Sequence, residues 1–183
     1  MASSGLTKTY GDCTYQTPPT QDVTAYVLVG LPGSGKSTWA RNLIQLKPNT
    51  LIVGGDPLRY MISGGGYVYK EEFEPVVRSI KKAAIPIVLR SGFNLIIDET
   101  NITSKRRNEL LVDIGDVART VAVVFSEKNN NLQNRMKEAR GYNAEKWQEV
   151  IEKMRAAWED VNENFSDILY VSDPNDPKSF EGV

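Results

Sequence analysis

The chain has 183 residues, of which 40% are hydrophobic and 25% are charged, and its formal net charge is −1. This composition is typical of one folded globular domain and excludes a chain that is disordered throughout. The sequence contains no histidine, which excludes histidine-based catalytic triads and histidine-ligated metal sites. Its only cysteine, Cys13, cannot form an intrachain disulfide or a cysteine cage for zinc or an iron–sulfur cluster. Any catalysis must therefore use carboxylates, lysine, arginine and hydroxyls.

The sequence has no apolar run of about 18 residues, the length that a transmembrane helix needs. Its first ten residues also lack the apolar core of a signal peptide. We therefore expect a cytoplasmic protein with no membrane partner. The neutral total charge does not indicate a general coat for nucleic acid, although a local basic groove is compatible with it. Basic residues do gather in three clusters: Arg78, Lys81 and Lys82; Lys105, Arg106 and Arg107; and Arg135, Lys137 and Arg140.

Both ends of the chain lack a periodic apolar pattern. Residues 1–22 are rich in Ser, Thr, Gly, Pro and Gln, and residues 173–183 contain two prolines and three acidic residues. We expect both segments to be tails, with one domain over residues 23–172 between them.

Within this domain, short apolar runs alternate with helical patterns. The runs expected as strands are residues 25–29, 51–53, 94–98, 120–125 and 167–171. The expected helices are residues 37–46, a helix that begins at Pro57 with Asp56 as its N-cap, 71–91 with a kink or break at Pro86, 104–114 capped by Thr103, 132–139, and 144–162. This alternation predicts an α/β fold with a parallel five-stranded sheet and helices on both faces, and ligands then bind at the carboxyl ends of the strands.

The strongest motif, GLPGSGKST, follows the first expected strand and matches G-x-x-x-x-G-K-[ST]. Glycines let the backbone turn so that several N–H groups point at one phosphate, and the following helix adds its positive dipole end. Lys36 would reach the β- and γ-phosphates of ATP, and the Ser37 hydroxyl would ligate Mg²⁺. The motif predicts a P-loop NTPase-type three-layer sandwich with ATP as co-substrate. The expected ATP-binding residues are Gly30, Leu31, Pro32, Gly33, Ser34, Gly35, Lys36, Ser37 and Thr38.

Two acidic residues end neighbouring expected strands. Asp98 stands where P-loop proteins hold the magnesium ion and its water shell, so it is a candidate metal residue together with Ser37. Asp56 is a candidate for the carboxylate that accepts the proton of an acceptor hydroxyl, a role compatible with helix capping. Arg59 lies one helical turn further on and can reach an acceptor phosphate.

The basic residues near position 140 lie between the fourth and fifth expected strands. Arg135 and Arg140 are candidate catalytic residues of a lid, because arginines on a mobile segment can stabilise charge on a transferring phosphoryl group.

Taken together, the runs GLPGSGKSTWAR, GGDPLR, IIDETN and the ARG at 139–141 resemble the 5′-hydroxyl polynucleotide kinase domain of phage-type end-healing enzymes and related phage DNA-modifying kinases. The resemblance implies that Asp56 is the general base, that Arg59 contacts the acceptor phosphate, and that Arg140 belongs to the lid. It also implies an acceptor side lined by Thr100, Asn101 and a preceding acid. Asp98 and Glu99 both qualify as that acid.

Three functions are compatible with these residues. The first is an ATP-dependent kinase that phosphorylates a hydroxyl of nucleic acid, either a 5′ end or a hydroxymethyluracil base. The second is a kinase of a sugar, nucleotide or other metabolite, and the third is a non-catalytic nucleotide-binding module. Arg59 favours an acceptor that carries a phosphate, and Tyr60, Tyr67 and Tyr69 could stack an acceptor base. The sequence gives neither the oligomeric state nor a choice between DNA and RNA.

Overall fold

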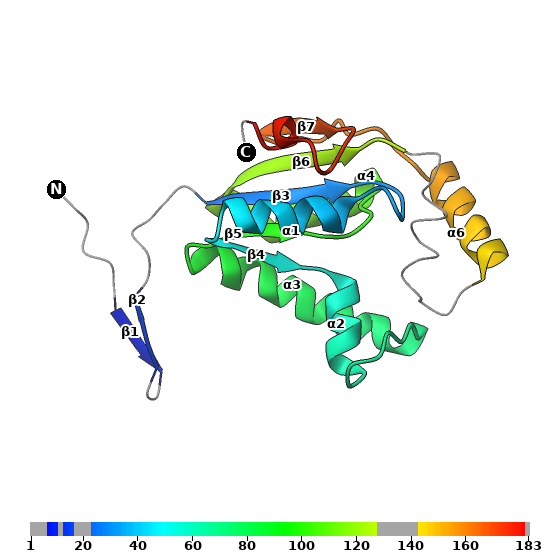
Figure 1. The fold of residues 1–183 in the computed structure, drawn as a ribbon. Helices are drawn as coiled ribbons and strands as arrows, with labels where there is room; N and C mark the ends of the chain where they lie inside the picture. The colour runs from blue at the N-terminus through cyan, green and yellow to red at the C-terminus, as the bar shows by residue number, and fades with distance from the viewer. Residues whose placement is uncertain (1–6, 11–12, 17–22, 128–142, 182–183) are drawn as a thin grey trace.

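The computed structural model describes residues 7–10, 13–16, 23–127 and 143–181. At its centre is a five-stranded sheet in the order β4-β5-β3-β6-β7, in which every neighbouring pair is parallel (Figure 1). The strands are β3 (Thr24–Val29), β4 (Thr50–Val53), β5 (Asn94–Ile97), β6 (Arg119–Phe125) and β7 (Asp167–Val171). All five expected strands are confirmed.

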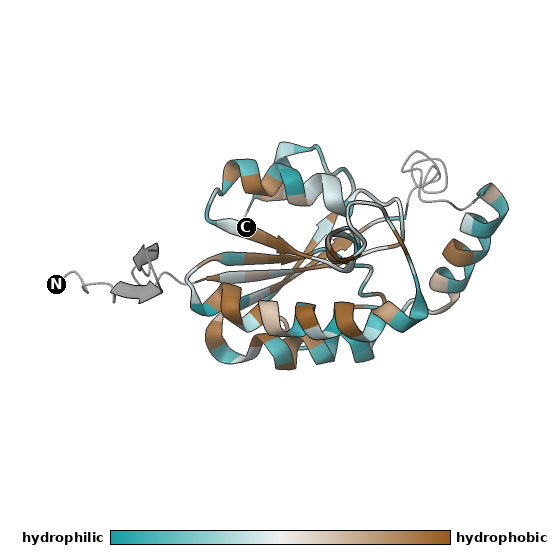
Figure 2. Ribbon diagram, turned by 90° about the horizontal axis from the view of Figure 1, so that it is seen from below, coloured by the Kyte–Doolittle hydropathy of each residue, from teal (hydrophilic) through white to brown (hydrophobic). Residues whose placement is uncertain are grey.

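Helices cover both faces of this sheet, as Figure 2 shows by the brown strands between the helices. On one face, α1 (Lys36–Leu46) packs through Trp39, Ala40 and Leu43. On the other face, α3 (Glu74–Arg90) and α4 (Ser104–Ile114) pack through apolar side chains that include Ile85 and Leu110. The short 3₁₀ segments η1 (Glu71–Phe73) and η2 (Gly115–Val117) flank these two helices. The fold is the three-layer α/β sandwich of P-loop NTPases.

The middle strand, β3, shows why this sheet needs helices on both sides. All six of its residues are buried, and alternate side chains enter opposite cores. Val27 packs in the α3–α4 core, whereas Tyr26 and Leu28 pack in the α1 core. A strand of a parallel sheet that is covered on both faces is therefore continuously apolar, as the run AYVLV is.

The start of α2 (Gly55–Ile62) differs from the expectation. Gly54 is the N-cap, in an extended conformation, and Asp56 lies inside the first turn rather than at the cap. Its carboxylate instead pairs with Arg59, one turn further along the helix. An acid in the first turn still interacts favourably with the helix dipole, so a sequence cannot easily distinguish this position from the cap.

Two other expected helices also differ from the structure. The helix predicted over 71–91 is a 3₁₀ turn followed by α3, which continues through Pro86. We attribute this continuity to Ile85 and Leu89, which are buried against the sheet on both sides of the proline. The last helix, α6 (Ala144–Ala156), ends before residue 162, and Trp158 and Val161 pack on the core from irregular backbone. The helix expected over 132–139 lies outside the described residues.

The C-terminal segment that we expected as a tail packs against α1. Its 3₁₀ helix η3 (Pro177–Phe180) places the Phe180 ring on Trp39, with centroids 5.5 Å apart and nearly parallel planes. The Trp39 indole N–H donates to the carbonyl of Ser179 at 3.1 Å, and Asn42 donates to that of Pro174 at 3.1 Å. These contacts extend the α1 core beyond residue 172.

In the N-terminal segment, β1 (Thr7–Tyr10) and β2 (Cys13–Gln16) form an antiparallel pair that is separate from the main sheet. Among the described residues, no helix combines the length and apolar character that crossing a bilayer requires.

Candidate active site

An open cleft of about 1460 Å³ lies at the carboxyl ends of the strands. In Figure 1 the strand arrows of the sheet point toward this side, where α6 and α2 stand. The cleft is lined by the P-loop, the start of α2, residues 98–102, one face of α6, and Pro174 with Asn175. The position is the one that doubly wound sheets use for ligands, because loops from several strands converge there.

The P-loop links the buried end of β3 to the first residue of α1. Gly33 and Gly35 have φ values of 79° and 99°, in the left-handed region that favours glycine. The largely buried Lys36 ammonium donates to the carbonyls of Gly30 at 2.9 Å and Leu31 at 2.8 Å. Lys36 is thereby held inside the loop, where the phosphates of a bound nucleotide would lie.

Ser37 and Asp98 meet beside this lysine. The Ser37 hydroxyl lies close enough to the Asp98 carboxyl to affect its pKa, although the two residues come from different elements. Burial raises the pKa of Asp98 above its ordinary 3.8, the nearby charge of Asp56 raises it further, and the Ser37 hydroxyl and the Lys36 ammonium oppose that shift. Both side chains offer oxygen ligands, the kind that Mg²⁺ prefers, so this pair fits a magnesium site.

The start of α2 lies close to Asp98 because β4 and β5 are neighbours in the sheet. The backbone N–H of Asp98 donates to the carbonyl of Val53 at 3.0 Å. A Cβ on Gly54 would lie 2.7 Å from the Asp98 carbonyl oxygen, so only glycine allows this approach. The close packing brings Asp56 to the side of the cleft that faces Asp98.

Arg59 is held by two carboxylates. Its Nε and Nη2 donate to the two oxygens of Glu74 at 2.7 and 2.6 Å, and its Nη1 donates to Asp56 at 2.8 Å. We call these two parallel hydrogen bonds between Arg59 and Glu74 the fork. Both residues expose 15% of their side chains, so solvent screens the fork only partly. The Glu74 hydrogen bonds raise the pKa of Arg59 further above its already high ordinary value and lower that of Glu74 below 4.5. Arg59 therefore links Asp56 to α3, and these bonds account for three of its five N–H donors.

The acidic residue after Asp98 has different partners. Glu99 forms ion pairs with Lys81 of α3 and with Arg106 of α4. Burial lowers the pKa of Lys81, and the Glu99 charge counteracts that shift. Asp98, not Glu99, is thus the acid that lies beside Ser37 and Lys36.

Thr100 and Asn101 line the cleft and also support the sheet. The Thr100 carbonyl accepts from the N–H of Gly30 at 2.9 Å, and the Asn101 amide donates to the carbonyl of Leu28 at 2.8 Å. Asn101 is buried with a φ of 44°, and within the described chain its Oδ1 has no hydrogen-bond partner. These contacts join the P-loop to the strand end beside it.

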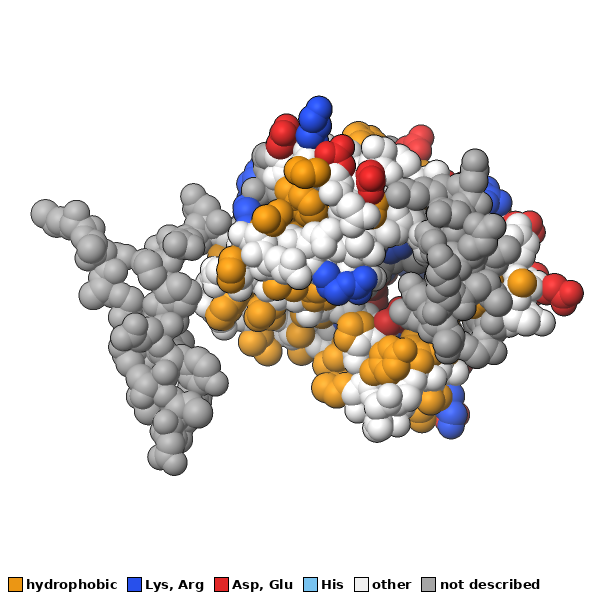
Figure 3. Space-filling view, viewed as in Figure 1, with side chains coloured by type: hydrophobic (Ala, Val, Ile, Leu, Met, Phe, Trp, Pro, Cys, Tyr) orange, Lys and Arg blue, Asp and Glu red, His pale blue; other side chains and the backbone are white. Residues whose placement is uncertain are grey.

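Aromatic side chains border the cleft at α2 and the loop that follows. Tyr60 and Tyr67 lie with ring centroids 5.6 Å apart, and Arg59 lies over Tyr69 at 5.4 Å. Figure 3 shows hydrophobic side chains gathered over α2, where Met61 and both Tyr60 and Tyr69 are exposed.

The structure thus brings together most of the expected site residues in one cleft: Lys36, Ser37, Asp56, Arg59, Asp98, Glu99, Thr100 and Asn101. Arg135 and Arg140 lie outside the described residues. Sequence reasoning missed Glu74 and Lys81, which hold Arg59 and Glu99. Lys81 belongs to a basic cluster visible in the sequence, but no local signal marks Glu74 as a site residue.

Comparison with known proteins relates the chain to several kinases. L-seryl-tRNA(Sec) kinase of Methanococcus maripaludis is 29% identical over 89 residues, 46% of this chain and 33% of that protein. Shikimate kinase of Corynebacterium glutamicum is 34% identical over 87 residues, 46% of this chain and 51% of that protein. A solved chain of the Pnkp1/Rnl/Hen1 complex is 26% identical with a TM-score of 0.55, and the match covers 66% of this chain and 40% of that one.

The chain thus spans about half of one curated relative and a third of the other. A broader match comes from the family model AAA_33, described as an AAA domain, which covers residues 26–161. That range includes the whole P-loop, the start of α2 and the segment after β5. The chain therefore belongs to the AAA_33 family of AAA domains.

Proposed function

We propose that the chain is an ATP-dependent kinase that transfers the γ-phosphate to a hydroxyl of nucleic acid. The observation that carries the proposal is that one cleft has a phosphate-binding side and, opposite it, a side with a carboxylate and an arginine. Lys36 and Ser37 occupy the phosphate-binding side, and the Asp56–Arg59 pair faces it from α2. A module that only binds nucleotide has no need of the second side, whereas a kinase needs a place for its acceptor.

In the proposed reaction the acceptor hydroxyl oxygen attacks the γ-phosphorus, the bond between that phosphorus and the β–γ bridging oxygen breaks, and ADP leaves. Asp56 orients the hydroxyl and takes its proton, as a carboxylate that its ion pair with Arg59 holds on the α2 side of the cleft. Lys36 stabilises negative charge on the β- and γ-phosphates. Ser37 and Asp98 would hold Mg²⁺, which neutralises charge on the phosphates when it is bound.

Two observations support nucleic acid as the acceptor. The tyrosines beside Asp56 offer aromatic surfaces on which a base can stack. The relatives also include an L-seryl-tRNA(Sec) kinase and a chain of the Pnkp1/Rnl/Hen1 complex. A 5′-hydroxyl end and a hydroxymethyluracil base within DNA both belong to a strand that carries phosphates, and in the proposed complex Arg59 would contact one of them.

A metabolite kinase is the second candidate. The relative with the higher identity of the two curated ones is a shikimate kinase, and the net charge of −1 gives no general attraction for polyanions. On this alternative Arg59 would only position Asp56, which its bonds to Glu74 and Asp56 already do.

The test is transfer of label from γ-labelled ATP to a panel of acceptors. The panel contains 5′-hydroxyl DNA, 5′-hydroxyl RNA, hydroxymethyluracil DNA, nucleosides, shikimate and gluconate. We expect label on at least one nucleic acid and not on the metabolites. If label appeared only on a metabolite, the nucleic-acid proposal would be wrong and the metabolite kinase would take its place.

A further inference from the structure

Two basic clusters that are far apart in the sequence meet at one groove between α3 and α4. The groove has a volume of about 570 Å³ and lies outside the P-loop side of the cleft. Its basic lining residues are Arg78, Lys81, Lys82, Lys105 and Arg106. Arg107 of the second cluster is not among them, because it is fully buried and paired with Glu163.

Cations outnumber acids in this groove. Its lining has five basic residues against the two acids Glu109 and Asp113, a difference of three positive charges. Lys82 pairs with Asp113 at 3.4 Å and Arg106 pairs with Glu109 at 3.0 Å. Lys81 pairs with Glu99 at the edge of the groove, so within the described residues the excess positive charge comes from Arg78 and Lys105.

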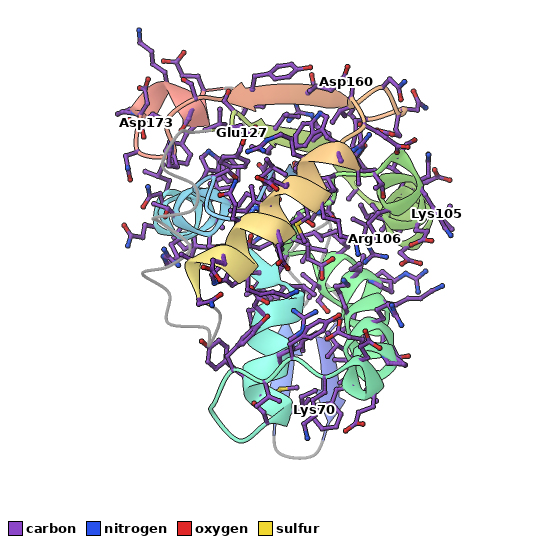
Figure 4. The ribbon with its side chains drawn as sticks, turned by 90° about the vertical axis from the view of Figure 1, so that its right-hand side faces the viewer. Lys70, Lys105, Arg106, Glu127, Asp160 and Asp173 are labelled. Carbon is purple, nitrogen blue, oxygen red and sulfur yellow. The ribbon has the colours of Figure 1, made fainter. Side chains whose placement is uncertain are left out.

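Two of the groove cations face solvent. Arg78 and Lys105 are both exposed, and within the described residues neither has an ion pair. Figure 4 shows Lys105 on the outer side of α4 and Arg106 nearer the centre of the view. Exposed cations in an open groove can contact phosphates without first breaking a buried pair.

The groove continues into the candidate active site. Arg106 lines both the cleft and the groove. Glu99, which lines the cleft, pairs both with Arg106 and with Lys81 on the groove side. A chain of phosphates that leaves the acceptor position beside Asp56 can thus pass Arg106 and reach the groove cations.

We propose that the groove between α3 and α4 binds the sugar–phosphate backbone of the acceptor strand, several nucleotides away from the phosphorylated hydroxyl. This inference rests on the proposed function, because it assumes that the acceptor is nucleic acid. The groove contributes affinity and direction without reading bases, since cations on phosphates carry no sequence information. It also explains how a chain of neutral total charge holds a polyanion.

The test is the double variant Arg78→Gln/Lys105→Gln, compared with Arg90→Gln/Lys178→Gln. The control removes the same two charges from exposed positions that do not line the groove. Binding of a fluorescent single strand of 20 nucleotides is followed by anisotropy at several salt concentrations. Each lost phosphate contact should reduce the slope of log affinity against log salt by about 0.7, or about 1.4 for the pair. That change corresponds to about 25-fold weaker binding near 0.1 M salt.

Transfer kinetics supply a second readout. The groove variant should raise the KM for the long strand and leave the KM for ATP and for a nucleoside 3′-monophosphate unchanged, because neither of those reaches the groove. Equal strand binding and salt slope in the groove and control variants would overturn the inference, and so would a wild-type protein that does not bind the strand. A third outcome separates the two proposals. If only the groove variant loses salt-dependent strand binding, and the wild type phosphorylates no nucleic acid, the groove proposal is supported and the kinase proposal is refuted.

Discussion

The fork between Arg59 and Glu74 gives a quantitative prediction about the proposed base. Glu74→Gln preserves the shape of the side chain and removes the charge that Arg59 binds at 2.7 and 2.6 Å. Hydrogen bonds to charged groups contribute about 1.5–3 kcal/mol each, and the partial exposure of this pair favours the lower end. If that energy holds Arg59 against Asp56, the kcat for transfer should fall roughly 10- to 150-fold, since about 1.4 kcal/mol is a factor of ten.

The assay is steady-state transfer of labelled phosphate with an excess of acceptor. The KM for ATP should not change, because the fork lies on the α2 side of the cleft. Glu72→Gln is the matched control, since Glu72 is 71% exposed and, within the described residues, its ion pair with Lys70 is long at 3.9 Å. A full kcat in Glu74→Gln would refute the role of the fork in positioning Asp56.

The same pair predicts how stability depends on pH. The Arg59 hydrogen bonds lower the pKa of Glu74 below 4.5 in the folded protein. A lowered carboxyl pKa contributes stability that is fully present above the unfolded value and is lost as the pH falls through the folded value. The Tm of the wild type should therefore drop more steeply below pH 4.5 than that of Glu74→Gln. An equal fall in Tm with decreasing pH in the two proteins would contradict this dependence of stability on the Glu74 pKa.

Three further substitutions test the rest of the site. Asp56→Asn keeps the size of the side chain but cannot take a proton, and kcat should fall at least about 100-fold with little change in Tm; near-full activity would exclude a base role. Arg59→Lys cannot reproduce the fork, so the acceptor KM should rise while the KM for ATP stays constant; a selective loss of ATP binding would contradict this placement. Gly54→Ala would force a Cβ to within 2.7 Å of the Asp98 carbonyl oxygen and should lower both kcat and Tm; unchanged values would show that the approach is not required.

Local patterns accounted for most of the fold. The five strands are short apolar runs bounded by glycines or polar residues, and the P-loop has a fixed spacing. Thr103 is the N-cap of α4 as predicted, because its side chain accepts from the N–H of Arg106. These features depend on residues within a few positions of one another, so the sequence displays them directly.

Features that depend on tertiary contacts were missed. The Arg59–Glu74 pair spans 15 residues, and the pairing of Lys81 with Glu99 spans 18. The polar C-terminal segment gave no periodic signal, although Phe180 stacks on Trp39 and the Trp39 indole donates to the carbonyl of Ser179. The N-cap of α2 was misassigned because Asp56 followed by proline is a common helix start, whereas Gly54 caps the helix through its backbone conformation alone.

The central claim is that the cleft transfers the γ-phosphate of ATP from its P-loop side to a hydroxyl on its α2 side. The most direct measurement compares labelled-phosphate transfer to 5′-hydroxyl and hydroxymethyluracil oligonucleotides by the wild type and by Lys36→Ala. Lys36→Ala removes the hydrogen bonds from Lys36 to the carbonyls of Gly30 and Leu31, so the fold of the variant is checked by circular dichroism. We predict ATP-dependent transfer by the wild type and none by the folded variant. Undiminished transfer by Lys36→Ala, or no transfer by the wild type to any nucleic acid, would contradict the account.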